Sequence, residues 1–585
     1  MNLKDLHLHW GESKYKQKKY RSYSLALPYK KNGKNRKKSV VKLGKLTQQE
    51  VKQWRTLLKA IKNPDAFLTT MDNISVSKHE KFLDVALVNA IWDEWQLDKV
   101  FPPKGKKDIS IATVARILTL NRCINPRAKS NVPEWFRASS LPWLLHVEAN
   151  RINSSRIFRE LVAIEQQKQN ISDYLFKRMK KNNPDSMKSI FYDLSSSCFS
   201  GTRCVLMKYG HCKEGFKNHV VLALVVNRDG LPFYWEVLPG NTADVNTIDW
   251  LLGCIKERFK IEGITLTFDR GMVSDDNLAA LESEEIKYIS AMDKNQVEGI
   301  TGLDFSQFSF LKPELAGEQF QQLPQFTKIN HNAYYREIKV EGKRRYILCF
   351  NPQLFKDQRN ARTQTVENFR MIANTLNEQL CQAKKSRNHK STYAKFERQL
   401  SKLKLKGFVD VTLKLKHVKV KLSDGSERNI RTYQAAVCLD DAKMFRAGRL
   451  DGFWLLVTNH IEKTKEGFKV NACEAIKPYR DKVVIESAFR DIKSFVEIEP
   501  IFVWTPLHVK AHYTICVLAY LINRILTLRL HKNKGDKTGN IVAHEKLYEE
   551  LSDCLIDHIE VENLGKSARK MTCLGAKQKE LLTRV

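Results

Sequence analysis

The order of strands and helices expected between residues 189 and 292 constrains the fold of this chain more than any other feature. Residues 219–227 form a near-continuous apolar run, Arg228-Asp-Gly230 is a turn signal, and residues 231–237 follow as another strand. With the segment that leads to Asp193, they predict a meander of three strands. Two more strands come next, each after a helix. The five expected strands are residues 190–193, 219–227, 231–237, 264–268 and 288–292.

Acidic residues stand at the first and fourth of these strands. Asp193 lies in Phe191-Tyr-Asp-Leu-Ser-Ser-Ser-Cys-Phe199, and Asp269 lies in Leu266-Thr-Phe-Asp-Arg-Gly-Met-Val-Ser274. Either string alone also fits an ordinary turn at the end of a strand. The order β-β-β-α-β-α-β, with acids on strands one and four, is what an RNase H-like fold needs. We therefore expect an α/β protein with an RNase H-like mixed sheet flanked by helices.

A third acidic residue, Glu486, lies in a segment with helical periodicity. On one helix, Tyr479, Lys482, Arg490 and Lys493 would fall within roughly 40° of Glu486, at ~100° per residue. Apolar residues, such as Ile485, Ala488, Phe489 and Ile492, lie mostly on other sides. We expect one helix that buries this apolar stripe and presents a carboxylate between a tyrosine and cations. The alternative is a surface helix with ordinary i,i+4 pairs.

Asp193, Asp269 and Glu486, converging on one point, would form an all-oxygen site suited to Mg²⁺. The chain carries 99 Lys+Arg against 65 Asp+Glu, a formal charge of +34. Such an excess indicates a polyanionic partner, nucleic acid before membrane. The three residues are therefore candidate catalytic residues and metal ligands for chemistry on a nucleic-acid phosphate.

The positive charge is concentrated in two segments. Residues 1–60 hold 17 Lys/Arg against 3 Asp/Glu, and residues 384–421 hold 13 against 2. The first contains Lys31-Asn-Gly-Lys34, which is typical of a hairpin turn. Both segments are candidates for nucleic-acid contact, and the alternative is a pair of solvated basic faces.

We expect a basic, mostly helical N-terminal region, with a capped helix from Asp108, and a large β-rich insertion that interrupts the sheet. The insertion would contain turns at Glu341-Gly342 and Asp424-Gly425 and, between them, a helical hairpin over about residues 357–406. Residues 1–62 would be a basic β-hairpin plus a helix that contacts DNA. Residues 63–185 would be a helical domain that binds DNA ends or only supports the fold. The RNase H-like core would comprise residues 186–292 and 479–530, the insertion domain residues 293–478, and a C-terminal tail with a role in oligomerisation residues 531–585.

The chain resembles the DDE transposases of bacterial insertion sequences. It is similar to the group marked by Tyr-x₂-Arg-x₃-Glu-x₆-Lys around the catalytic glutamate. The matching residues are Tyr479, Lys482, Glu486 and Lys493, with a lysine in the usual arginine position. A lysine offers a point charge rather than a bidentate fork, so its phosphate contact would differ in geometry. The strings around Asp193 and Asp269 match the first two acidic motifs of the group.

The resemblance implies cut-and-paste DNA transposition. Asp193, Asp269 and Glu486 would hold two Mg²⁺ ions, with Mn²⁺ as a substitute, for hydrolysis at transposon ends and then strand transfer into target DNA. Tyr479, Lys482 and Lys493 would bind DNA phosphates, with Arg270 and Arg490 as further candidates. The partners would be double-stranded DNA, both terminal inverted repeats and target, and a second copy of the chain in a homodimer.

Two other functions stay open. An RNase H-like nuclease that cuts DNA without joining it would use the same three acids. A catalytically inactive DNA-binding derivative would have no use for three converging carboxylates. The twelve cysteines form no Cys-x-x-Cys pair, and the apolar stretch 514–526, interrupted by Asn523 and Arg524, is too short to span a bilayer. We expect a cytoplasmic protein, associated with the nucleoid when bound to DNA.

Overall fold

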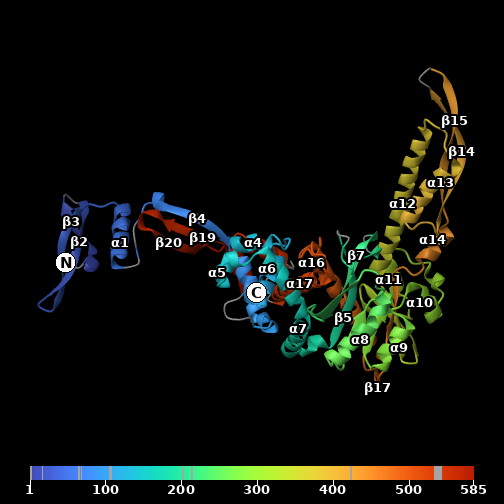
Figure 1. Cartoon of the computed structure of the whole chain (residues 1–585), viewed down its shortest axis with the longest axis horizontal. Helices are drawn as coiled ribbons and strands as arrows, with labels where there is room; N and C mark the ends of the chain where they lie inside the picture. The colour runs from blue at the N-terminus through green and yellow to red at the C-terminus, as the bar shows by residue number, and fades with distance from the viewer. Residues whose placement is uncertain are drawn as a thin grey trace. The chain divides into compact units, whose positions relative to one another are not determined.

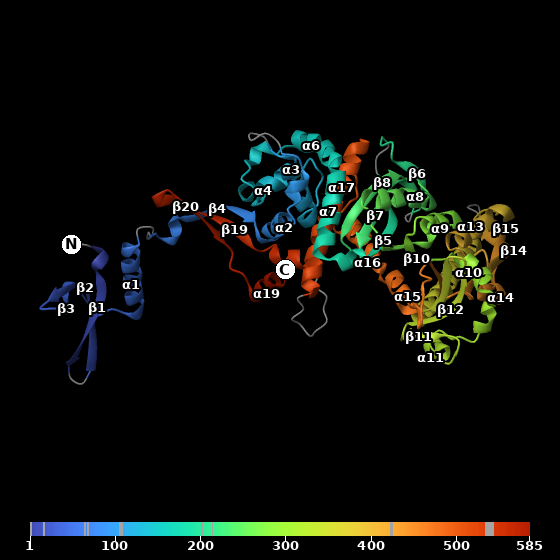
Figure 2. The same cartoon turned by 90° about the horizontal axis from the view of Figure 1, so that it is seen from below.

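The computed structural model describes residues 3–15, 18–63, 66, 69–103, 109–199, 203–212, 215–421, 425–532 and 543–585. Figures 1 and 2 show its elements from two sides. The chain divides into two compact units, which are described separately. The first comprises Met1–Asp84, Ala138–Ser140 and Glu549–Lys579, and the second comprises Val85–Arg137, Leu141–Tyr548 and Glu580–Val585. The predicted boundaries at 62/63 and 530/531 are not the boundaries of these units.

The first unit begins with an antiparallel sheet of β1 (His7–Tyr15), β2 (Lys18–Lys31) and β3 (Lys34–Gly44). The expected turn joins β2 to β3, with φ of 53° at Asn32 and 77° at Gly33. Positive φ at both central residues is the requirement of the hairpin turn that Asn-Gly favours. Helix α1 (Gln48–Lys62) follows and begins at a capping box of Thr47 and Glu50. The hairpin is thus confirmed, and β1 adds a third strand to it.

A second small sheet joins the two ends of the chain. Its order is β20-β19-β4, with β4 (Ile74–Lys81), β19 (Leu555–Val561) and β20 (Lys566–Met571). The helical domain expected over residues 63–185 contains the strand β4, which the sequence did not indicate. Most side chains of β4 are exposed, so the sequence has little of the apolar alternation that marks a strand. Its pairing partner lies almost the whole length of the chain away, beyond the reach of local patterns.

The second unit begins with helices, as expected for residues 83–182. Helix α17 (Pro506–Lys532) packs against two of them, α3 and α6, and against strand β8. The predicted cap of α3 at Asp108 lies outside the described residues, and Ser110 Oγ accepts from Thr113 N at 3.0 Å. The helices are α2 (Leu83–Glu94), α3 (Ile111–Ile124), α4 (Val132–Ala138), α5 (Leu141–Leu144), α6 (Ser154–Gln166) and α7 (Lys168–Asn182).

Helix α17 bears on the membrane question. Within the described part of the chain it is the one helix that is long and apolar enough to cross a membrane. The apolar stretch 514–526 was expected to be too short for this, but the helix that contains the stretch has 27 residues. The most apolar window of this 27-residue helix is, however, 83% buried inside the protein. One such helix is weak evidence for a membrane span, since a core helix has the same composition.

The central sheet has the strand order of the RNase H-like fold. Its consecutive neighbours are β8-β7-β5-β9-β10, where β7 pairs antiparallel with β5 and β8, while β5, β9 and β10 run parallel. The hairpin strand β6 adds to the free end of β7. The expected order of five strands and the α/β fold class are therefore confirmed. The elements are β5 (Ser189–Cys198), β6 (Lys208–Cys212), β7 (Gly215–Asn227), β8 (Pro232–Pro239), α8 (Ile248–Gly253), β9 (Thr265–Phe268), α9 (Asp275–Ser283) and β10 (Lys287–Ala291).

The segment expected as a separate insertion contributes four strands to this same sheet. Strand β16 pairs antiparallel with β10 on one side and with β13 on the other, and the order continues to β12 and β11. The turn expected at Glu341-Gly342 joins β12 to β13. The sheet therefore has ten strands. These elements are α10 (Lys294–Thr301), α11 (Ala316–Gln321), β11 (Thr327–Asn330), β12 (Ala333–Glu341), β13 (Arg344–Phe350) and β16 (Phe453–Thr458).

Between β13 and β16 the chain forms an arm, drawn yellow to orange in Figure 1. The arm consists of α12 (Pro352–Cys381), α13 (His389–Lys402), β14 (Val409–Lys421), β15 (Glu427–Leu439) and α14 (Asp441–Gly448). The two long helices match the expected helical hairpin, and the base of the β14–β15 ribbon buries Val409, Val411 and Ala435 against them. Of the expected turn at Asp424-Gly425, Asp424 lies outside the described residues.

The last elements of the second unit follow β16. A short hairpin of β17 (Lys463–Thr464) and β18 (Gly467–Phe468) precedes α15 (Ala472–Asp481) and α16 (Val483–Ser494). These two helices pack on the central sheet, α15 against β9 and β10 and α16 against β5. Helix α18 (His544–Leu551) comes after α17, and α19 (Ala576–Arg584) ends the chain.

Candidate active site

Asp193 lies within β5, between buried Tyr192 and buried Leu194. Side chains alternate across a strand, but the neighbours of Asp193 are both buried because β5 is a central strand of the sheet. Asp193 itself is partly exposed, and its Oδ1 accepts from Leu194 N at 2.9 Å. A central strand with ladder bonds on both sides fixes its backbone.

Asp269 follows the last residue of β9 and stands beside Asp193. The parallel register of β5 and β9 ends with Tyr192 opposite Phe268. The next residue on each strand is therefore an aspartate, and neighbouring strands lie about 4.8 Å apart. The sheet thus places two carboxylates side by side, as the sequence predicted from the strand order.

Glu486 lies on α16, and here the structure corrects the expected single helix. The segment forms two helices that meet at Lys482, where φ is −54° and ψ is −22°. At this point the helix tightens, since Ile485 N donates to Lys482 O at 2.9 Å while Glu486 N lies 3.5 Å from the same oxygen. Tyr479 lies in α15 and Glu486 in α16, but both stay near the aspartates, because Lys482 contacts Asp269 and the charge of Glu486 acts on Tyr479.

Two lysines fasten these helices to the strands that carry the aspartates. Lys482 Nζ lies 2.7 Å from Asp269 Oδ1, and Lys493 Nζ donates to Ser196 O of β5 at 2.5 Å. Glu486 lies between the two lysines in the chain. The exposed Glu486 is consequently held over the strands that carry Asp193 and Asp269.

The negative charges of all three acids affect the pKa of Tyr479. Burial and, after it, the negative charge of Asp269 raise the pKa of Tyr479, and Glu486 and Asp193 add to this rise while Arg270 opposes it. The three carboxylates are therefore close enough to one another to act on one phenol. Since its pKa is raised, the Tyr479 hydroxyl keeps its proton at neutral pH and serves as a hydrogen-bond donor.

The charge state of Asp269 is set by its cationic neighbours. Burial by itself would raise the pKa of this carboxyl, but the charge and hydrogen bond of Lys482, with smaller effects from Arg270, hold it below its usual value. Asp269 is therefore ionised across the neutral range. Three neighbouring carboxyl groups offer the oxygen donors that a hard divalent cation takes, and the Lys482 ammonium on Asp269 would compete with such a cation. The donor set consequently fits the predicted metal ligands.

The predicted DNA-binding residues fall into two groups. Lys482 and Lys493 contact protein oxygens in this structure, and the side chain of Lys482 is only 9% exposed. Arg270 and Arg490 are exposed, and Arg490 lines a different cavity, together with Asp491 and His544. Tyr479 is partly buried. Their contacts with DNA remain predictions.

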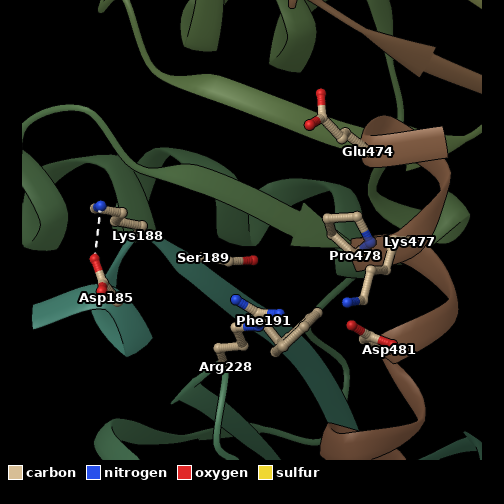
Figure 3. Close-up of a pocket in the computed structure, with 9 residues that line it drawn as sticks. All are labelled: Asp185, Lys188, Ser189, Phe191, Arg228, Glu474, Lys477, Pro478 and Asp481. Carbon is tan, nitrogen blue, oxygen red and sulfur yellow. Dashed lines mark ion pairs between the residues drawn. The ribbon is translucent and has the colours of Figure 1, made fainter. Parts of the chain in front are cut away.

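A cavity of about 540 Å³ lies beside this site, at the start of β5 and along α15. Figure 3 shows the side chains of Arg228, Lys477 and Asp481 directed into it, and Lys188 paired with Asp185 at 2.6 Å. None of the three candidate acids lines it. The turn at Arg228-Asp-Gly230 supplies Arg228, and no pattern in the sequence indicates that this turn lines a cavity.

Comparison with known proteins gives one extended match. The family model of the transposase DDE domain matches residues 200–522, more than half of the chain. The match contains Asp269 and Glu486 and begins seven residues after Asp193. No curated protein matches the chain.

Solved structures with some similarity include transposases bound to DNA. A piggyBac transposase synaptic complex with hairpin DNA has 10% sequence identity and a TM-score of 0.32, over 80% of this chain and 75% of that one. A Mos1 transposase paired-end complex with the left transposon end has 12% identity and a TM-score of 0.14, over 42% of this chain and 68% of that one. At such scores the assignment rests on the family match and on the strand order of the central sheet. The chain belongs to the transposases with a DDE domain.

Proposed function

We propose that this protein is a transposase of the bacterial insertion-sequence type. It would cut phosphodiester bonds at the ends of its element and join the freed 3′ ends to target DNA. The observation that carries this proposal is the register of β5 and β9, which sets Asp193 beside Asp269 under a helix that presents Glu486. A protein that only binds DNA gains nothing from three acids that repel phosphates.

The three acids would be the catalytic residues and the ligands of two Mg²⁺ ions, with Mn²⁺ as a substitute. Divalent cations at such a site supply an activated water and stabilise the charge on the leaving 3′ oxygen. Asp269 is suited to this role because Lys482 keeps it ionised. Tyr479 would donate its hydroxyl proton to a DNA phosphate, and Lys482 would exchange Asp269 for a phosphate when DNA enters.

Double-stranded DNA would be the partner, both as transposon ends and as target. The formal charge of +34 supports a polyanionic partner, and exposed lysines of the β14–β15 ribbon and the β1–β3 sheet are available for phosphates. Cleavage at two ends would require a homodimer in the active complex. The protein would act in the cytoplasm, on the nucleoid.

Two alternatives predict different products. An RNase H-like nuclease would cut the ends and leave them unjoined. An inactive derivative would bind the ends and leave them intact. No feature of the site favours either alternative over a transposase.

The test is cleavage of DNA that carries the repeats flanking the gene, with Mg²⁺, Mn²⁺ or EDTA. We expect metal-dependent cuts at the repeat ends by the natural protein. Asp193→Asn, Asp269→Asn and Glu486→Gln should each reduce cutting by at least about 100-fold, since each removes a ligand to an ion that stabilises transition-state charge. Asp276→Asn is the matched control, because Asp276 is an exposed carboxylate on α9.

The products then separate the three functions. Joined products with a supercoiled target plasmid support a transposase, whereas cut ends that never join support a nuclease. Binding without cuts in the natural protein supports an inactive derivative. Cuts that survive Asp193→Asn would show that the catalytic assignment is wrong.

A further inference from the structure

A cluster of one histidine and two carboxylates lies outside the acidic site. It consists of Asp491 on α16 and of His544 and Glu545 at the start of α18. Each residue offers one ligand atom, and these atoms all lie within 4.8 Å of one another. We infer that Asp491, His544 and Glu545 form a second metal site, for a divalent transition-metal ion such as Zn²⁺.

The distance between two of the ligand atoms fits a shared ion. His544 Nε2 and Asp491 Oδ1 lie 3.1 Å apart. Two donors on one Zn²⁺ at about 2.1 Å are separated by roughly 3.0 to 3.4 Å in octahedral or tetrahedral geometry. Both atoms are buried, and among the described residues neither makes a hydrogen bond in addition to this contact with the other. The side chain of His544 is only 8% exposed, so little water can reach its ring to form a hydrogen bond with Nε2.

A hydrogen bond of the other ring nitrogen, Nδ1, orients the Nε2 atom of His544. His544 Nδ1 lies 3.0 Å from Thr527 Oγ1 of α17. When Nδ1–H donates to that hydroxyl, Nε2 turns its lone pair toward Asp491 Oδ1. In that tautomer two acceptors face each other, and a cation bound by both would remove their repulsion. A ligating histidine characteristically makes such an outer hydrogen bond through its second nitrogen.

The surroundings hold the ring and leave a path to it. Phe495 packs edge-on against the His544 ring at 4.7 Å between centroids, and Tyr548 is also edge-on to it at 6.0 Å. A cavity of about 230 Å³ opens onto Asp491, His544 and Glu545. Of the cations at this cavity, Arg524 donates to Asp229 O at 2.7 Å. The cavity has room for the waters that would complete the coordination of an ion.

This donor set differs in chemistry from the acidic trio. An imidazole nitrogen favours Zn²⁺, Co²⁺ and similar ions, whereas three carboxylates favour Mg²⁺ and Mn²⁺. The position also differs, because Asp491 comes five residues after Glu486 on the same helix. An ion at the cluster would therefore link the helix of Glu486 to α18 and, through Thr527, to α17.

The experiment is a Co²⁺ titration of the full chain carrying Asp193→Asn, Asp269→Asn and Glu486→Gln, followed by visible absorption. These three substitutions remove the acidic site from the measurement. We expect one Co²⁺ per chain, displaced by Zn²⁺, with absorption bands that report a nitrogen ligand. Adding Glu545→Gln should weaken binding at least tenfold, and adding His544→Ala should abolish the bands.

The controls separate a lost ligand from a lost fold. Glu545 is exposed, so Glu545→Gln leaves the packing intact, and the circular dichroism of each variant is compared with that of its parent. His417→Ala removes an exposed imidazole on β14 and should change nothing. Absence of Co²⁺ binding up to millimolar concentration overturns the inference, and so does binding that His544→Ala leaves unchanged. Either result would mean that His544 and Asp491 form only an ordinary ion pair.

Discussion

Lys482→Met tests whether Lys482 and a divalent cation compete for Asp269. The ammonium lies 2.7 Å from Asp269 Oδ1, and methionine keeps most of the side-chain volume without the charge. The substitution also lets the pKa of Asp269 rise, because burial then acts unopposed by Lys482. That rise opposes the expected effect, so the titration is made at pH 8, where protons compete least for this carboxyl. We therefore expect Lys482→Met to bind Mn²⁺ more tightly than the natural protein in the absence of DNA.

The size of the effect follows from Coulomb's law. A cation about 2.1 Å from the carboxylate would lie roughly 4 Å from Nζ. Unit charges at that distance repel by about 1 kcal/mol in water and about 4 kcal/mol at an effective dielectric constant of about 20, and a divalent ion doubles both. The side chain of Asp269 is 44% exposed, so the lower limit applies. Removing about 2 kcal/mol of repulsion corresponds to an affinity increase of about 30-fold.

The assay is a Mn²⁺ titration by electron paramagnetic resonance, in protein that also carries Glu545→Gln so that the acidic trio alone is measured. Lys493→Met is the matched control, because Lys493 donates to a main-chain oxygen of Ser196 rather than to a carboxylate. An affinity for Lys482→Met within threefold of the natural protein, or below it, would refute the reasoning. It would mean that Lys482 does not rest on Asp269 in solution, or that Asp269 does not bind the ion.

Three further predictions concern stability and DNA binding. Burial raises the pKa of Glu165 to about 7, although the charge of Lys168 opposes the rise. Its contribution to folding is therefore fully present below pH 4.5, where the carboxyl is protonated in both the folded and the unfolded chain, and is lost as the pH rises through 7. Glu165→Gln should then stabilise the protein at pH 8 by up to about 3 kcal/mol, with a gain that shrinks toward pH 5; equal gains in urea unfolding at both pH values would contradict this. A Cβ on Gly240 would lie 2.0 Å from His219 O. Gly240→Ala should therefore lower the unfolding temperature and reduce the free energy of unfolding by about 3 kcal/mol. Gly253→Ala is the control, because a Cβ there has no atom within 4 Å and should leave the unfolding temperature unchanged. Lys414, Lys416 and Lys419 of β14 are exposed, and all three are changed to glutamine. The slope of the logarithm of the DNA-binding constant against the logarithm of the salt concentration should then become shallower by up to about 2.7. An unchanged slope in a filter-binding series would exclude these lysines as phosphate contacts.

The RNase H-like core was predictable because its signals are local. Residues 220–226 of β7 are a run of buried apolar residues, followed by the turn at Arg228-Asp-Gly230. Asp269 follows a short apolar strand, whereas β5 continues past Asp193 to Cys198, beyond the expected end of that strand. From the parallel arrangement of strands one and four, the proximity of Asp193 and Asp269 follows without any knowledge of side-chain contacts. This part of the site was therefore predictable from the sequence alone.

The rest of the sheet was not predictable, because strand pairing across long chain separations leaves no local pattern. Nothing in the six residues of β16 indicates that one edge pairs with β10 and the other with β13. The same holds for β4, whose partner β19 comes more than 470 residues later. Length suggested a separate inserted domain, but the chain returns to the core sheet twice and only the α12–β15 arm lies apart from it.

The helix break at Lys482 shows what a wheel calculation omits. A wheel assumes one axis, whereas the chain forms two helices here, and Ile485 N donates to Lys482 O at 2.9 Å in a tighter turn. Pro478, which lacks an N–H, lies inside α15 four residues before this turn, and the helix continues past it. Lys482 still contacts Asp269, and the charge of Glu486 still acts on Tyr479. The wheel therefore predicts which side chains gather at the aspartates better than it predicts where one helix ends and the next begins.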